Sequence, residues 1–355
     1  MTQVASQRQD TEAAELDVQL GLWAGALESR QATAATVLAL ASAAERISRL
    51  VAEGPLAGGL GVETGLVNAD GDIQKTLDVE TNRIVIGALS ASPTAYYASE
   101  EEDAILTLNA GAPLAVAVDP LDGSSNIDTN VSIGTIFSIL PASDRGATAS
   151  FLRPSSDQLA AGYFLYGPHT SLVLTVGDGT HLFALDPSTR TFRLAHRAIQ
   201  IPPVANEFAI NVSNYRHWSA PVRSYIDDCL KGATGPRRKN FNMRWLASMV
   251  ADAHRIFIRG GVYLYPGDDR PGYERGRLHQ LYEAAPIAML VEQAGGGATD
   301  GLTRILDKSP ADLHQRTPFI FGSRAKVEMI RAYHTDPAYA RDAAPLFQPR
   351  GLFMS

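Results

Sequence analysis

The segment Asp119-Pro-Leu-Asp-Gly-Ser-Ser-Asn126 places two carboxylates three residues apart beside a turn. Carboxylates at this spacing can converge on a hard divalent cation, which prefers oxygen ligands. Gly123 permits a tight turn, and Ser124 and Ser125 favour a helix start, where free backbone N–H groups bind anions. The segment therefore predicts a pocket that holds a metal ion and a phosphate side by side. The alternative is a capped turn with two solvated aspartates.

A second acidic segment, Ser99-Glu-Glu-Glu-Asp103, precedes the first one in the chain. Such a run alone is most often a solvated loop. However, it follows an expected strand at 94–98, and the unbroken apolar run 114–118 predicts a second strand that is buried on both faces. Ligands bind where strand ends meet in an α/β sheet, so we expect the two acidic segments to face each other. Carboxylates this dense repel one another without a cation, which favours a metal site.

The apolar patterning predicts the elements that must position these residues. In the first half we expect helices at 16–27, 32–51 and 75–89, and further strands at 131–140, 160–165, 171–176, 181–185 and 191–195. Asp78 lies in the first turns of the third helix, where it either serves the site or only complements the helix dipole. The glycine-rich stretch 54–72 is long for a loop, and we expect it to close on the site.

In the second half we expect strands at 208–212 and 262–265 and helices at 221–230, 244–257, 278–293 and 325–333. The linker candidate is Ile201-Pro-Pro-Val204. We therefore expect an α/β fold with an N-terminal domain at 16–203 that carries the metal and phosphate motif and a C-terminal domain at 204–340. Residues 1–15 are expected to be disordered, and residues 341–355 are expected to form a C-terminal tail.

The composition excludes some classes of protein. Of 355 residues, 45% are hydrophobic and 19% charged, as in ordinary globular proteins, and the net charge of −7 argues against a nucleic-acid partner. An anionic substrate stays possible, because a bound metal inverts the local potential. The single cysteine, Cys229, allows no intramolecular disulfide and indicates a reducing compartment. No apolar run is long enough for a membrane span, so we expect a soluble cytoplasmic protein.

Together, Ser99-Glu-Glu101 and Asp119-Pro-Leu-Asp-Gly-Ser-Ser125 resemble the signature of the lithium-sensitive, magnesium-dependent sugar and inositol phosphatase superfamily. More specifically, the chain resembles class I fructose 1,6-bisphosphatase. Further segments carry this resemblance, which extends from about residue 32 to 333: Ala160-Ala-Gly-Tyr-Phe-Leu-Tyr-Gly167, Gly260-Gly-Val-Tyr-Leu-Tyr-Pro266 and Leu281-Tyr-Glu283.

The resemblance implies an alternating α-β-α-β-α sandwich of two domains, assembled as a homotetramer. It implies two or more Mg²⁺ ions per active site, with Mn²⁺ able to substitute, held by Glu100, Asp119, the Leu121 carbonyl, Asp122 and Glu283. Asp78 and Glu101 would position and deprotonate the attacking water, although Glu102 could exchange roles with Glu101. The reacting phosphate would be bound by Asp122, Gly123, Ser124 and Ser125.

The distant phosphate would be held by Asn211, Tyr265, Arg277 and, from a neighbouring subunit, Arg244. Two residues depart from the family pattern: Arg277 replaces a lysine, and Trp245 replaces a tyrosine and so loses a hydroxyl donor. Both lie in the segments expected at the distant phosphate, so the substrate choice depends on them.

The implied reaction is Mg²⁺-dependent hydrolysis of the 1-phosphate of fructose 1,6-bisphosphate, in gluconeogenesis or the reductive pentose phosphate cycle. The alternatives are a sedoheptulose 1,7-bisphosphatase or dual-specificity enzyme and, from another class, a non-catalytic phosphate-binding regulator. Animal members are inhibited by AMP through basic and aromatic residues, and here the matching positions hold Pro113, Leu114 and Pro141. We therefore expect no AMP inhibition at that site.

Overall fold

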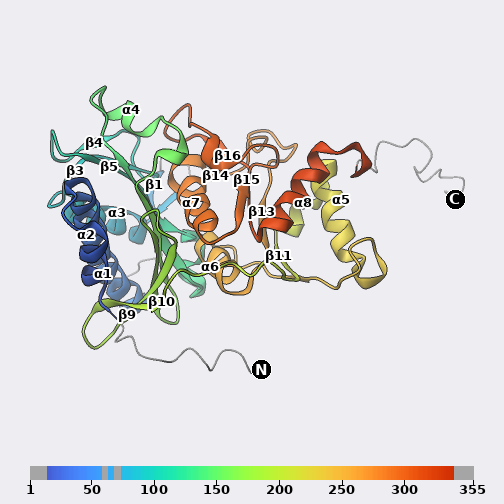
Figure 1. Cartoon of the computed structure of the whole chain (residues 1–355), viewed down its shortest axis with the longest axis horizontal. Helices are drawn as coiled ribbons and strands as arrows, with labels where there is room; N and C mark the ends of the chain where they lie inside the picture. The colour runs from blue at the N-terminus through green and yellow to red at the C-terminus, as the bar shows by residue number, and fades with distance from the viewer. Residues whose placement is uncertain (1–13, 58–62, 68–72, 340–355) are drawn as a thin grey trace, which may run out of the picture.

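The computed structural model describes residues 14–57, 63–67 and 73–339. Its described part is built of five alternating layers of helices and sheets (Figure 1). The first sheet has eight strands in the order β10-β9-β8-β7-β6-β5-β3-β4. Their bounds are β3 Thr94–Ser99, β4 Leu106–Thr107, β5 Leu114–Asp122, β6 Ile133–Pro141, β7 Ala160–Tyr166, β8 Thr170–Thr175, β9 Thr180–Asp186 and β10 Thr191–His196.

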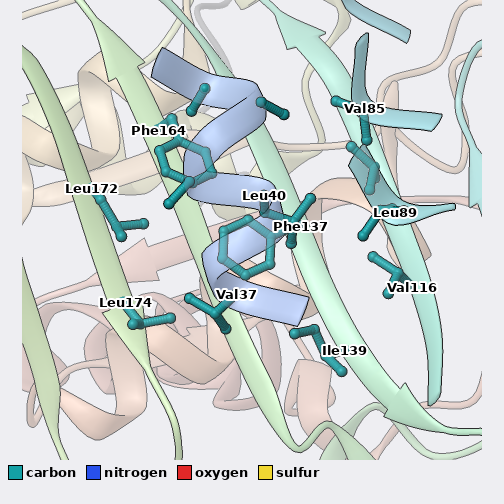
Figure 2. Close-up of a cluster of buried hydrophobic side chains, with 14 of the residues drawn as sticks. Val37, Leu40, Val85, Leu89, Val116, Phe137, Ile139, Phe164, Leu172 and Leu174 are labelled. Carbon is teal, nitrogen blue, oxygen red and sulfur yellow. The ribbon is translucent and has the colours of Figure 1, made fainter. Parts of the chain in front are cut away.

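Three helices cover the outer face of this sheet: α1 Leu16–Ala24, α2 Glu28–Glu53 and α3 Thr76–Leu89. Val37, Leu40 and Ile47 lie at helical spacing on α2 and are buried, as an amphipathic stripe requires. Figure 2 shows Val37 and Leu40 packed against Phe137 and Phe164 of the sheet. Gly54 ends α2 with φ 54°, and its N–H donates to the Val51 carbonyl.

The middle layer consists of α6 Met249–Arg259 and α7 Ala285–Gln293. Their apolar side chains fill one continuous core with the inner face of the first sheet and one face of the second sheet. Members of this core from the three layers include Tyr163 of β7, Val250 of α6, Ile287 of α7 and Phe321 of the second sheet.

The second sheet has the strand order β12-β11-β13-β17-β15. Its strands are β11 Glu207–Ala209, β12 Asn242–Met243, β13 Val262–Tyr265, β15 Gly297–Thr299 and β17 Phe319–Gly322. The outermost layer, α5 Ala220–Leu230 and α8 Arg324–Thr335, packs on its far side. The expected α-β-α-β-α arrangement is therefore confirmed.

Some expectations differ from the structure in detail. The stretch 54–72, expected to be a loop, contains the strand β1 Glu63–Val67, which pairs antiparallel with β2 Ile73–Lys75. Residues 58–62 and 68–72 lie outside the described residues, as do 1–13 and 340–355, which include most of both expected tails. Ala14 and Glu15 pair with β10, since the Leu194 N–H donates to the Ala14 carbonyl.

Two helices expected in the second half begin later than predicted. Residues 244–248 are not helical, with φ 59° at Ala247, and α6 begins only at Met249. The helix expected from 278 begins as the strand β14 Leu278–His279, which pairs with β16 Arg316–Thr317, and continues through a π-helical turn, Gln280–Ala284, into α7. The helical periodicity of this segment is a local pattern, so it carries no information about the distant strand β16. Pairing with β16 makes residues 278–279 a strand in spite of that periodicity. No helix in the described ranges combines the length and the apolar character needed to span a bilayer.

Candidate metal and phosphate site

The two aspartates of the central motif lie in β5 itself, which extends through Asp122, beyond the expected end at 118. Asp119 pairs with Ile136 of β6 and Asp122 with Gly134, so β5 carries one extra residue and forms a bulge. A proline is tolerated at a bulge because it has no N–H to donate to the ladder. The Leu121 N–H donates to Asp119 Oδ1 at 2.9 Å, which closes the bulge locally. The bulge therefore turns both aspartates toward the same end of the strand.

Asp122 accepts hydrogen bonds from residues at the start of α6. Its Oδ2 accepts hydrogen bonds from Ser248 Oγ at 3.1 Å and from the Val250 N–H at 3.0 Å. Gly123 has φ 80°, and a Cβ there would lie 2.9 Å from the Ser248 Cβ. Only glycine combines this backbone conformation with this close approach.

Gly123 is followed by a short 3₁₀ helix, η2 Ser124–Thr129. Ser124 is half-buried and Ser125 is exposed, so the start of this turn is open to solvent. Lys75 Nζ donates to the Ser124 carbonyl at 3.1 Å and to Asp128 Oδ2 at 2.8 Å, which ties the start of α3 to the turn.

The second acidic segment does reach the same edge of the sheet. β3 runs parallel to β5 with Ser99 opposite Val118, and the Glu100 N–H donates to the Val118 carbonyl at 3.1 Å. Glu100 therefore leaves its strand directly beside Asp119. A solvated loop does not describe Glu100, because its side chain is only 21% exposed.

The next two glutamates have different surroundings. Glu102 Oε1 accepts a hydrogen bond from Asn82 Nδ2 at 2.7 Å, and Asn82 in turn accepts from the hydroxyls of Tyr97 and Ser99. Glu101 instead contributes negative charge at Asp119. This difference favours Glu101 over Glu102 as the residue that faces the aspartates.

Glu283 comes from the π-helical turn before α7, far away in the sequence. One carboxylate oxygen from each of Asp119, Asp122 and Glu283 lies within 4.8 Å of the others, and all three residues are buried. A π-turn widens the helix and is frequent at functional sites. The expected convergence of these acids is present in the structure.

The electrostatics of this cluster are those of a cation site. Burial raises the pKa of Asp122 to about 7, and the Glu283 carboxylate adds to the shift while the hydrogen bonds from Val250 and Ser248 oppose it. Burial also raises the pKa of Asp119 well above its ordinary value. Neighbouring carboxylates reinforce that shift in the order Glu100, Asp122, Glu283 and Glu101. A divalent cation would remove this repulsion, so the oxygen-rich donor set fits Mg²⁺ or Mn²⁺.

Two residues that contact the site were not predicted from the sequence motif. His279 is 2% exposed, and with Glu100 and Glu283 it forms a second group of possible ligands whose donor atoms lie within 4.8 Å of one another. Its four-residue spacing from Glu283 was the available signal, although the two residues are not on one α-helix. Lys75, which binds the phosphate-motif turn, gave no signal because its partners are distant in the sequence.

Asp78 lies in the first turn of α3, as expected, and its Oδ2 accepts a hydrogen bond from the Lys75 N–H at 2.7 Å. This is the local helix-start role that was left open as the alternative. Burial raises the pKa of Asp78 to about 6, against the lowering effect of Lys75. A carboxylate with a pKa near neutrality suits a general base. The structure therefore shows the helix-start role, and the catalytic role of Asp78 stays a prediction.

The residues expected at the distant phosphate lie in the second half. Burial raises the pKa of Tyr265, while the Arg277 guanidinium lowers it and the Glu283 carboxylate raises it, so these three groups lie within electrostatic reach. Asn211 Oδ1 accepts from the Ser213 N–H and Oγ, which makes it the cap of a 3₁₀ turn, η4 Val212–His217. Arg244 is exposed and directly follows the edge strand β12, and its Nη1 donates to the Met243 carbonyl at 2.9 Å.

Comparison with known proteins gives consistent matches over the whole described fold. The family described as fructose-1-6-bisphosphatase, N-terminal domain, matches residues 23–197, and the corresponding C-terminal domain family matches residues 201–335. A class 1 fructose-1,6-bisphosphatase of Xanthobacter autotrophicus is 54% identical over 335 residues, covering 94% of this chain and 90% of that protein. A relative with the same description from Cereibacter sphaeroides is 56% identical over 312 residues, covering 88% and 91%.

Among solved structures, Leishmania major fructose-1,6-bisphosphatase in its holo form superposes with a TM-score of 0.84 at 34% identity. This match covers 91% of the present chain and 99% of the other. The sequence matches and the structural match therefore agree along nearly the full length. The chain belongs to the class 1 fructose-1,6-bisphosphatase family.

Proposed function

We propose that this protein is a phosphoric monoester hydrolase that removes the 1-phosphate of fructose 1,6-bisphosphate, giving fructose 6-phosphate and phosphate. The observation that carries the proposal is the convergence of Asp119, Asp122 and Glu283 within 4.8 Å of one another. This cluster lies next to the turn at Gly123, whose start is open to solvent. The substrate is inferred from family membership, and the position of the cation and the reacting phosphate is inferred from the geometry of the cluster and the turn.

In this proposal two or more Mg²⁺ or Mn²⁺ ions are held by Glu100, Asp119, the Leu121 carbonyl, Asp122 and Glu283. When bound, such cations neutralise the phosphate charge and lower the pKa of a coordinated water, which makes it nucleophilic near neutral pH. Leu121 lies in the bulge between the two aspartates, which supports its assignment to the set.

The chain's own groups bind the phosphate and handle the proton. The first N–H groups of a helical turn have no partner within the turn, so those of Gly123, Ser124 and Ser125 are placed to bind the phosphoryl oxygens. Glu101 orients the attacking water and accepts its proton. Asp78, with its pKa raised to about 6, assists this step from the start of α3.

The distant phosphate is assigned to Asn211, Tyr265 and Arg277 of the same chain and to Arg244 of a neighbouring copy in a homotetramer. The exposure of Arg244 supports its assignment to a subunit interface. Two apolar side chains near it in the sequence are also exposed, Met243 at 39% and Leu246 at 41%. Exposed apolar residues around a charged group are typical of a protein interface.

We place the domain boundary near residue 204, between a 16–203 unit and a 204–340 unit, because each unit contains one of the two large sheets. The two units share the middle-layer core, so the boundary separates the sheets and leaves the interior continuous. We place the enzyme in the cytoplasm, in gluconeogenesis or the reductive pentose phosphate cycle.

Sedoheptulose 1,7-bisphosphate is the second candidate substrate, because the two departures from the family pattern lie at the sugar-binding end. Trp245 stacks on Tyr263 with 5.7 Å between ring centroids and tilts against Tyr265 at 5.9 Å. Its indole therefore occupies space next to an assigned phosphate ligand. A comparison of kcat/KM for the two bisphosphates decides between them.

The direct test is a phosphate-release assay on a panel of sugar bisphosphates with Mg²⁺ and with EDTA. We expect release from fructose 1,6-bisphosphate that requires the cation and is lost in Asp122→Ala. The matched control is Asp128→Asn, which removes a 59%-exposed carboxylate from the same turn and should retain activity. Release by Asp122→Ala equal to that of the unmodified protein would refute the assigned site, and no release from any bisphosphate would favour the non-catalytic regulator.

A further inference from the structure

His279 is a buried imidazole that adjoins the acidic cluster and has no role in the proposed hydrolysis. Its Nδ1 lies 3.3 Å from Glu283 Oε2 and 3.5 Å from Glu100 Oε1. The side chain is 2% exposed, while that of Glu100 is 21% exposed, so the group has a buried side and an accessible side.

The two distances distinguish between a hydrogen bond and shared coordination. An N–H···O hydrogen bond usually measures about 2.7–3.2 Å, which is shorter than both distances. Ligand atoms bound to one divalent cation at about 2.1 Å lie roughly 3.0–3.5 Å apart in octahedral or tetrahedral geometry. The two distances from Nδ1 therefore match those expected between neighbouring ligands of a single ion, and all three donor atoms lie within 4.8 Å of one another.

The backbone around His279 is fixed before any ion binds. His279 pairs with Arg316 in the β14–β16 ladder, and the Gln280 N–H donates to the Gln315 carbonyl at 2.8 Å. The His279 N–H also donates to Glu283 Oε2, which holds the histidine and the glutamate as one unit.

Aromatic neighbours fix the plane of the ring. The imidazole meets Tyr282 edge-on with 5.5 Å between centroids, and it meets His314 edge-on at 5.8 Å. A preorganised ring of this kind loses little entropy on binding an ion, so its nitrogen is an effective ligand.

We propose that His279 Nδ1 is a metal ligand, which together with Glu100 and Glu283 makes one position of the site a nitrogen-containing position that favours Zn²⁺ over Mg²⁺. Carboxylates alone suit Mg²⁺, whereas an added imidazole suits borderline ions. This inference rests on the metal cluster of the proposed function, and it assigns one residue and one ion preference beyond it.

The test measures metal binding without any sugar phosphate, so an inactive protein would still report on His279. Zn²⁺ and Mg²⁺ are titrated calorimetrically into the metal-free full chain and into His279→Gln. We expect the Zn²⁺ Kd to rise by about tenfold or more in the variant, since loss of a group around a metal typically weakens affinity by about 10–100-fold. The Mg²⁺ Kd should change by less than about threefold, because Mg²⁺ is bound through oxygen.

The matched control is His314→Gln, which removes a neighbour of the ring but no proposed ligand and should raise the Zn²⁺ Kd much less than His279→Gln does. X-ray absorption at the zinc edge, with less than one equivalent of Zn²⁺, should show imidazole scattering in the unmodified protein and in His314→Gln but not in His279→Gln. Equal weakening of both metals in His279→Gln would indicate a purely structural role and overturn the proposal. So would absence of imidazole scattering in the unmodified chain, a measurement that stands even if the variant does not fold.

Discussion

Replacement of Asp122 by Asn separates the stability of this site from its ability to bind metal. The side-chain carboxyl has a pKa of about 7 in the folded chain against an ordinary value of 3.8, so the folded state binds more protons than the unfolded state between these values. The contribution of Asp122 to the stability of the metal-free protein should therefore fall as the pH rises from about 4 to about 7. One pKa unit corresponds to about 1.4 kcal/mol, so ionised Asp122 costs on the order of 4 kcal/mol at pH 8.

An asparagine removes the charge but keeps the local hydrogen bonds. Its Oδ1 can accept from Ser248 Oγ and the Val250 N–H, as Asp122 Oδ2 does now. Its Nδ2 can donate to the remaining carboxylates of Asp119 or Glu283. In EDTA at pH 8 we expect Asp122→Asn to be more stable than the unmodified protein by about 1–3 kcal/mol, since structural relaxation already absorbs part of the full cost.

Urea unfolding of both proteins, in EDTA and in excess Mg²⁺, measures this difference. A ligand that binds only the folded state stabilises it by mass action, so Mg²⁺ should stabilise the unmodified protein much more than the variant. Asp128→Asn is the control, with a change within about 0.5 kcal/mol and a normal response to Mg²⁺. The reasoning is wrong if metal-free Asp122→Asn is less stable than the unmodified protein, or if both respond equally to Mg²⁺.

Four further predictions concern Gly123, His254, AMP and the single cysteine. Gly123→Ala should lower both stability and kcat/KM, because φ is 80° and the new Cβ would lie 2.9 Å from the Ser248 Cβ. The control is Gly111→Ala, where φ is 85° but no atom lies within 4 Å of the Cβ position. It isolates the backbone strain of roughly 1–2 kcal/mol and should retain kcat/KM. Burial lowers the pKa of His254 from 6.5 to about 4, so this residue binds fewer protons in the folded state than in the unfolded state between these values. Its contribution to stability should fall by up to about 3 kcal/mol as the pH drops through this window, which is opposite in sign to the contribution of Asp122. Urea titrations at pH 7 and pH 4.5 give the change in the free energy of unfolding between the two pH values. Acidification should destabilise His254→Gln less than the unmodified protein, and equal changes in the two proteins would show that His254 does not contribute. Titration with AMP should leave activity unchanged, because Pro113, Leu114 and Pro141 offer no side-chain donor to a phosphate; tight inhibition by AMP would contradict this. Treatment with a dithiol should also leave activity unchanged, because Cys229 is the single cysteine, and a change in activity on reduction would contradict that expectation.

The sequence by itself predicted most of the helices and strands and the local phosphate and metal motif, while the layered arrangement of these elements was implied by the family resemblance. Apolar runs such as 114–118 and the stripe on α2 predict buried elements because hydrophobic periodicity is a local property. The spacing of Asp119 and Asp122 and the glycine that follows them are likewise local, so the turn between strand and helix could be predicted from these residues.

The tertiary structure decided which distant side chains join that motif. Glu283, His279 and Ser248 reach Asp122 and its neighbours only because the middle helical layer packs against the first sheet, and nothing in their own neighbourhoods in the sequence specifies that contact. The bulge in β5 and the strand β14 have the same origin, since each depends on pairing with a strand remote in the chain. Local patterns determine the elements, whereas burial and pairing between elements determine the charge and the geometry of the site.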